Sequence, residues 1–252
     1  MLSGSAVIIT GASSGIGRAT ALELAGQGTR LCLLARSEAA LAQVAEEAKA
    51  RGAQETLIAA CDVQKAFEVE RAVQVALHGF GRVDILINSA GLSLNGEVDG
   101  YALDDWRTVI DTNLTGTFLT CRAVLPTMKQ QRRGQIINIS SGAGRNGIKN
   151  MAAYCAAKFG VVGFTEALGL EVRHHNIRVS VLLPGSVATN FSRTASRADQ
   201  AQAEKAEPRD IGYAMTAEEV AAVITAMLAQ PAQAWMSEVV LRPLNLELRR
   251  TI

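Results

Sequence analysis

The chain has 252 residues, of which 48% are hydrophobic, 19% charged and 4% aromatic, and its 25 Lys and Arg against 24 Asp and Glu leave a net charge of +1. The balanced charge argues against a nucleic-acid partner, which needs a basic stripe, and the few aromatic residues argue against a protein that stacks bases. The apolar content excludes intrinsic disorder, and no apolar run reaches the roughly 18 residues of a membrane span.

Short apolar runs alternate with longer stretches of helical periodicity. The runs are continuous, which is typical of strands buried on both faces. Their repeated alternation with helices predicts an α/β fold, a doubly wound parallel β-sheet of the Rossmann type, formed by a single domain over 1–252. We expect strands at 6–10, 30–36, 56–62, 84–90, 135–140, 177–183 and 237–243, and helices at 15–27, 38–51, 66–79, 103–131 (kinked at Pro126), 151–174 and 216–229.

The segment 190–215 breaks this alternation because it is polar, Ala-rich and weakly periodic. A stretch of this length without a firm element is unusual in a compact domain. We expect either a lid over the substrate site or a pair of surface helices with loops.

A glycine-rich loop joins the first strand to the first helix. Thr10, Gly11, Gly15 and Gly17 follow the spacing G-x-x-x-G-x-G. Glycine lets the backbone approach a pyrophosphate, and the helix start offers unpaired N–H groups to it. The spacing therefore predicts a dinucleotide site, with a purely structural glycine turn as the alternative.

The second strand ends at Arg36, where dinucleotide folds place the adenosine ribose. An acidic residue there binds both ribose hydroxyls, whereas a planar cation favours a 2′-phosphate. Arg36 therefore predicts NADP(H) in preference to NAD(H). A solvated surface arginine is the alternative.

Tyr154 and Lys158 are four residues apart and share one face of a helix. A nearby ammonium should lower the pKa of a tyrosine, which makes the pair a candidate proton donor and acceptor. An exposed surface pair would have the same spacing. Ser141 ends a buried strand thirteen residues before the tyrosine, where ligand chemistry gathers in α/β sheets, and its hydroxyl could bind a substrate carbonyl oxygen.

The four cysteines lie far apart, without zinc or disulfide spacing, and no cluster has the spacing of metal ligands. The first expected strand begins so early that it leaves no room for a signal peptide. These features predict a cytoplasmic protein without a bound metal.

The ordered motifs give the chain a strong resemblance to the short-chain dehydrogenase/reductase family, from Thr10 to about Pro243. Besides the glycine loop, Tyr154, Lys158 and Ser141, the chain has Asn88-Ser89-Ala90-Gly91, where the family has Asn-Asn-Ala-Gly. It also has Asn113 in the long helix and Pro184-Gly185-Ser186-Val187-Ala188-Thr189, which matches Pro-Gly-x-Val-x-Thr.

The resemblance implies an oxidoreductase in which Tyr154 transfers a proton to or from the substrate oxygen. Lys158 would lower the tyrosine pKa and bind the nicotinamide ribose, Ser141 would polarise the carbonyl, and Asn113 would hold a water for proton resupply. The remaining cofactor contacts implied are Ser13, Ser14 and Ile16 in the loop, Asp62 and Val63 at the adenine, Asn88, Ala90 and Gly91 in the adenosine pocket, and Pro184, Gly185, Val187 and Thr189 at the nicotinamide.

We therefore expect an NADP(H)-dependent carbonyl reductase or alcohol dehydrogenase that acts on a small carbonyl or alcohol substrate, as a homodimer or homotetramer. A 3-oxoacyl-carrier-protein reductase is one alternative, although the chain has Arg242-Pro243-Leu244 where those enzymes often end in Gly-Gly. A non-catalytic NADP-binding sensor on the same fold is another, and it should have lost part of the tetrad Asn113, Ser141, Tyr154 and Lys158. Leu92, Leu94, Asn146 and Ile148 are expected to line the substrate pocket.

Overall fold

The computed structural model describes residues 2–189, 191, 214–231 and 233–244. Its strands form one parallel sheet in the order β3-β2-β1-β4-β5-β6-β7. The fold is therefore the predicted α/β fold with a doubly wound parallel sheet. The strands are β1 (Ala6–Thr10), β2 (Arg30–Ala35), β3 (Glu55–Ala60), β4 (Ile85–Asn88), β5 (Gly134–Ile139), β6 (Ile177–Pro184) and β7 (Glu238–Leu241).

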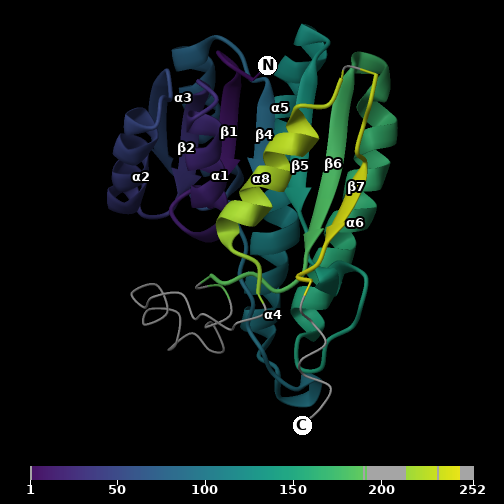
Figure 1. The fold of residues 1–252 in the computed structure, drawn as a ribbon. Helices are drawn as coiled ribbons and strands as arrows, with labels where there is room; N and C mark the ends of the chain where they lie inside the picture. The colour runs from purple at the N-terminus through teal and green to yellow at the C-terminus, as the bar shows by residue number, and fades with distance from the viewer. Residues whose placement is uncertain (1, 190, 192–213, 232, 245–252) are drawn as a thin grey trace.

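Helices cover both faces of the sheet (Figure 1). One hydrophobic cluster joins the sheet to α1, α2 and α8, and another joins it to α3, α5 and α6. The principal helices are α1 (Gly15–Ala25), α2 (Glu38–Ala50), α3 (Ala66–Phe80), α4 (Leu103–Ile110), α5 (Gly116–Gln131), α6 (Ala152–Val172) and α8 (Ala217–Leu228). Short helical turns are η1 (Val98–Gly100), η2 (Asp111–Thr115), η3 (Gly142–Gly144) and η4 (Arg173–His175).

The strand β1 shows why the apolar runs are continuous. Val7 and Ile9 pack in the first cluster, whereas Ala6 and Ile8 pack in the second. Successive strand residues point to opposite faces, and here both faces are covered by helices. An apolar residue is therefore required at every position of this strand.

The predicted helix 103–131 is divided into three parts. The α-helical hydrogen bonding stops at Ile110, and the π-helical turn Asp111–Thr115 precedes α5. The α5 assignment continues across Pro126, so the interruption lies before this proline. Single π-helical turns inside α-helices are frequent at functional sites, and the turn Asp111–Thr115 contains Asn113.

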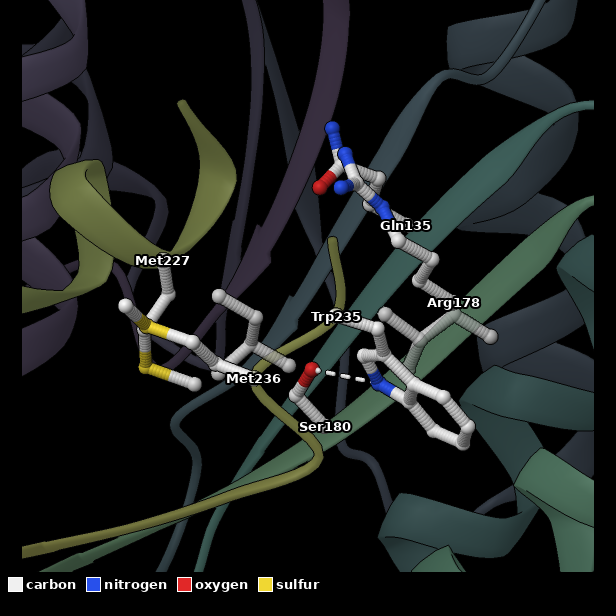
Figure 2. Close-up of a pocket in the computed structure, with 8 residues that line it drawn as sticks. Gln135, Arg178, Ser180, Met227, Trp235 and Met236 are labelled. Carbon is white, nitrogen blue, oxygen red and sulfur yellow. Dashed lines mark hydrogen bonds between the residues drawn. The ribbon is translucent and has the colours of Figure 1, made fainter. Parts of the chain in front are cut away.

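At the amino ends of β5 and β6, the chain that follows α8 is fastened to the sheet. Figure 2 shows Trp235 facing Ser180, to which its ring nitrogen donates a hydrogen bond of 3.2 Å. Arg178 donates to the carbonyl oxygens of Gln230, Pro231 and Ala234. The depression beside these residues has no volume for a water molecule, so we assign it a structural role.

Candidate active site

The crevice that a doubly wound sheet offers to ligands lies beyond its carboxyl strand ends, where the strand order reverses. In this sheet the reversal falls between β1 and β4, whose last residues, Thr10 and Asn88, are paired. These ends lie at the lower edge of the sheet in Figure 1, on the side where α4 is found.

The glycine loop leaves no room for side chains at two of its positions. Gly11 has a φ of +65°, and a Cβ there would stand 2.9 Å from the Cα of Ala90. A Cβ on Gly17 would stand 2.3 Å from the carbonyl oxygen of Gly11. Such distances lie well inside van der Waals contact, so only glycine allows this close packing of the loop.

The loop leads into the start of α1, whose first N–H groups have no partners within the helix. The N-cap Ser14 makes no side-chain capping bond, and it is exposed, while Ser13 and Ile16 are half-buried. Gly15 faces Thr189, since a Cβ on Gly15 would lie 3.4 Å from the Cγ2 of Thr189. The predicted loop residues and the predicted nicotinamide residue therefore meet at one place, and the glycine-lined helix start fits a pyrophosphate.

A hollow of about 340 Å³ lies at the carboxyl ends of β2 and β3. Arg36 and Asp62, the two residues predicted at the adenosine end of the cofactor, both line it. Val63 is buried, and it packs against the position of Gly116, where a Cβ would stand 2.8 Å from the Cγ2 of Val63. Its side chain therefore packs against the start of α5, and the predicted adenine contact stays a prediction.

The Asn88 side chain is engaged inside the protein, and its place in the adenosine pocket stays a prediction. Its amide donates to Asn138 at 2.9 Å and accepts from Thr120 at 2.7 Å, and it is 4% exposed. Asn138 in turn donates to Thr165 of α6 at 2.9 Å. The Asn88 side chain thus ties β4 to β5 and the helices behind them. The next residues of the motif are held by Thr10, whose hydroxyl accepts from the N–H groups of Ser89 and Ala90 at 3.1 Å.

Tyr154 and Lys158 lie side by side in the first turns of α6, and both are buried. The Lys158 ammonium is 5.6 Å from the centre of the Tyr154 ring and donates to the carbonyl oxygen of Ile139 at 2.9 Å. Burial lowers the pKa of Lys158 to about 8. This environment is unlike that of an exposed i,i+4 pair.

Burial raises the pKa of Tyr154 to about 12, against a lowering effect of its hydrogen bond with Ser141. For the protein alone the net shift of the tyrosine pKa is upward, because desolvation outweighs the lowering influence of Ser141, and the lowering effect expected of Lys158 stays a prediction. The phenol is protonated at neutral pH, which suits a proton donor. Ser141 also begins the turn η3, where its oxygen accepts the N–H of Ala143 at 3.2 Å.

Asn113 is fully buried in the π-helical turn, with its amide nitrogen bonded to the carbonyl oxygens of Leu92 and Val109. Its Oδ1 has no hydrogen-bond partner. This oxygen and the Lys158 ammonium both face Gly91, where a Cβ would lie 2.7 Å and 3.6 Å from them. A buried acceptor without a partner costs about 1–3 kcal/mol, so Oδ1 is suited to a water or a ligand hydroxyl.

The segment that follows β6 turns back towards the site. Gly185 donates to the carbonyl oxygen of Leu241 at 2.7 Å, and Val187 forms a parallel bridge with Met215. Pro184 is the last residue of β6, and Thr189 faces the glycine loop as described above. The four residues predicted at the nicotinamide therefore lie on one strand end and the turn after it.

Most of the predicted lid at 190–215 lies outside the described residues. Phe191 is described, and its ring centre is 5.5 Å from that of Tyr154. Among the predicted pocket residues, Leu92 joins the apolar cluster around Tyr154 and Leu94 is buried within it, whereas Asn146 and Ile148 are exposed. A substrate role for these residues stays a prediction.

Three neighbours of the site were not predicted. Ser140 donates to the backbone carbonyl oxygen of Lys158 at 2.9 Å, and Ile139 accepts from its ammonium. Lys65 lines the hollow beside Arg36. The sequence signal for Ser140 was its place directly before the predicted site residue Ser141, at the end of β5. In the described part of the chain, no His, Cys, Asp and Glu group could hold a metal ion, and no helix is long and apolar enough to span a membrane.

The sequence and the structure of this chain are similar to those of known short-chain oxidoreductases. A family model described as short chain dehydrogenase matches residues 5–200. A 3-oxoacyl-[acyl-carrier-protein] reductase of Synechocystis is 36% identical, over 94% of both chains. A metagenomic short-chain oxidoreductase solved with NADP superposes with a TM-score of 0.82 at 34% identity, over 96% of this chain and 98% of that one. An actinorhodin polyketide ketoreductase variant solved with NADPH has a TM-score of 0.84 at 31% identity, over 95% and 96%.

Proposed function

The chain belongs to the short-chain dehydrogenase/reductase family, and we propose that it is an NADP(H)-dependent oxidoreductase that interconverts a carbonyl group and a secondary alcohol. One observation carries this proposal. The buried pair Tyr154 and Lys158, with Ser141 bonded to the tyrosine, lies beyond the same strand ends as the glycine loop. A proton donor and a dinucleotide cradle therefore share one crevice.

The bound cofactor would supply or accept the hydride at the carbonyl carbon. Tyr154 gives its proton to the carbonyl oxygen, because its pKa of about 12 keeps the phenol protonated. Ser141 orients the substrate oxygen and donates a hydrogen bond to the charge that develops there. In the oxidative direction both residues act in reverse: Tyr154 first releases its proton towards Lys158 and then takes the proton of the alcohol as a phenolate.

Lys158 and Asn113 return the proton to Tyr154. The ammonium has a pKa of about 8, so it can release and regain a proton near neutral pH. The unpartnered Oδ1 of Asn113 faces the same glycine as the ammonium and would hold a water there. The same ammonium would hydrogen-bond the nicotinamide ribose. Together with Ser141 and Tyr154, these residues form the catalytic tetrad of the proposal.

Arg36 supports NADP(H) as the cofactor. It lines the hollow where the adenosine ribose is expected, and its planar cation suits a 2′-phosphate. Two structures of similar proteins contain NADP or NADPH.

The described strands form one sheet, which supports a single nucleotide-binding domain. The four cysteines are free and buried, which supports a reducing, cytoplasmic location.

A 3-oxoacyl thioester is a second candidate substrate, because two similar proteins are named as a 3-oxoacyl carrier-protein reductase and a polyketide ketoreductase. The reaction at the carbonyl would be the same, and only the group that carries the ketone would differ. A non-catalytic sensor has less support, since all four tetrad residues are present and three of them are buried.

We also propose a homodimer or homotetramer that pairs the surfaces of α5 and α6. Phe118 on α5 and Phe159 on α6 are more than 40% exposed, and Leu170 is 62% exposed. Large apolar side chains gathered on neighbouring helices are typical of a contact between subunits.

The test is the substitution Tyr154→Phe, measured with a panel of ketones and 3-oxoacyl thioesters while NADPH consumption is followed. Wild type should consume NADPH with at least one member of the panel. The variant should lose turnover by at least about 10²-fold, the contribution of a positioned proton donor, and should bind NADPH within a few-fold of wild type. Turnover retained by the variant would refute the role of Tyr154.

A further inference from the structure

The hollow at the carboxyl ends of β2 and β3 contains more charge than Arg36 supplies. Its volume is about 340 Å³, which falls within the range of ligand pockets. The first turns of α3 contribute Lys65, Glu68 and Arg71 to its lining, beside Arg36 and Asp62. Three cations and two carboxylates therefore surround the space where the adenosine end of the cofactor is expected.

Both carboxylates are already engaged within the protein. Glu68 accepts the backbone N–H of Asp62 through Oε2 at 2.8 Å, and its Oε1 lies 3.0 Å from the Lys65 ammonium. These two contacts lower the pKa of Glu68. The Asp62 carboxylate accepts the N–H of Gln64 at 3.1 Å. Glu68 is thus anchored to the backbone and holds Lys65 at the edge of the hollow.

The cations differ in how firmly they are held. Arg71 donates to the carbonyl oxygen of Ala60 at 3.3 Å, so its guanidinium is directed along the end of β3. The Lys65 side chain is 62% exposed and meets Glu68 from the N-cap position of α3. An ammonium on a flexible stem with one carboxylate partner can turn to a stronger anion. A phosphate monoester, with close to two negative charges at neutral pH, is such an anion.

Resting on the proposed use of NADP(H), we propose that Lys65 is a second cation for the 2′-phosphate. Glu68 competes with the phosphate for the Lys65 ammonium and so limits what Lys65 adds to binding. With a cofactor that lacks this phosphate, Lys65 stays paired with Glu68 and contributes nothing to binding. With the phosphate present, Lys65 turns to it and adds to the attraction of Arg36. The pair Lys65 and Glu68 therefore helps to determine the preference for NADP(H) over NAD(H).

The test compares the binding of 2′,5′-ADP and 5′-ADP by isothermal titration calorimetry at low ionic strength. Lys65→Met should weaken 2′,5′-ADP binding about fivefold, the upper range for an exposed ion pair, and leave 5′-ADP binding unchanged. Glu68→Gln keeps an acceptor for the N–H of Asp62 but removes the competing charge, so it should strengthen 2′,5′-ADP binding about threefold. Both effects should shrink as salt is added, because the groups are exposed.

Lys49→Met is the matched control. Lys49 pairs with Glu46 at 2.7 Å in the same three-residue spacing, but it lies on α2 and does not line the hollow. This variant should bind both nucleotides as wild type does. Thermal unfolding of each variant verifies that the fold is intact.

The results separate the inference from the function on which it rests. If Lys65→Met and Glu68→Gln leave 2′,5′-ADP binding unchanged, or alter both nucleotides alike, the role of Lys65 is refuted. If wild type itself binds the two nucleotides equally, the proposed preference for NADP(H) fails as well. Opposite changes in the two variants, confined to 2′,5′-ADP, would establish the pair as a determinant of cofactor preference.

Discussion

Replacing Lys158 by methionine should make the protein more stable at neutral pH, although it removes a residue of the proposed mechanism. The ammonium is buried, and its pKa falls from 10.5 to about 8 for that reason alone. At 1.36 kcal/mol per pKa unit, the burial of the charge costs about 3 kcal/mol. Methionine fills a similar space without charge, but it leaves the carbonyl oxygen of Ile139 without its bond, at a cost of about 1 kcal/mol.

The net gain of about 2 kcal/mol should raise the melting temperature by about 5 °C for a chain of this length. The gain should depend on pH. Between pH 8 and 10.5 the unfolded chain keeps the lysine proton that the folded chain has released, so the wild type becomes more stable as pH rises through this interval. The difference between variant and wild type should therefore shrink towards about pH 10. The raised pKa of Tyr154 has the opposite effect on stability, but only above pH 10, where the unfolded chain begins to lose the tyrosine proton that the folded chain keeps.

Urea unfolding from neutral pH to about pH 10 measures both effects. Lys49→Met again serves as the control, because Lys49 is exposed and should give no such gain. The reasoning would be refuted by a Lys158→Met variant that is less stable than wild type at neutral pH, together with a wild type whose stability does not rise above pH 8.

Three further predictions concern the cofactor site and the assembly. Arg36→Asp should shift preference from NADPH towards NADH, measured as the ratio of their kcat/KM values, and an unchanged ratio would remove Arg36 from phosphate recognition. Gly17→Ala should abolish calorimetric binding of 2′,5′-ADP, because its Cβ would stand 2.3 Å from the Gly11 oxygen. Gly26→Ala, where the nearest atom would lie 3.4 Å away, should bind normally, and equal binding by both variants would contradict the close packing of the loop. Sedimentation at micromolar concentration should show a dimer or tetramer, which Phe118→Asp weakens, whereas a monomeric wild type would contradict the proposed assembly.

The strands could be predicted closely because burial on both faces leaves a continuous apolar run. The expected strand 6–10 coincides with β1, and the expected helix 216–229 differs by one residue at each end from α8, whose capping box of Thr216 and Glu219 is present. The break between α4 and α5 could not be predicted, since the periodicity of 103–131 continues through it. The π-helical turn depends on packing around Asn113, which no local pattern records.

The site shows the same division between motif and environment. The sequence placed Gly11, Ser141 and Tyr154 correctly at strand ends or helix starts, because these positions follow from chain order. The sequence did not predict that the Asn88 side chain makes buried hydrogen bonds to Asn138 and Thr120. It also did not predict that desolvation raises the pKa of Tyr154. Both depend on residues distant in sequence. Lys65 and Glu68 likewise line the same hollow as Arg36 only because β2 pairs with β3.

The most direct test of the central claim is transfer of deuterium from nicotinamide C4 of labelled NADPH to a ketone that wild type reduces. The account predicts that the secondary alcohol carries deuterium on its carbinol carbon with wild type, and that Tyr154→Phe binds the labelled NADPH but forms none of this alcohol. An alcohol without deuterium, or labelled alcohol formed equally by the variant, would contradict it.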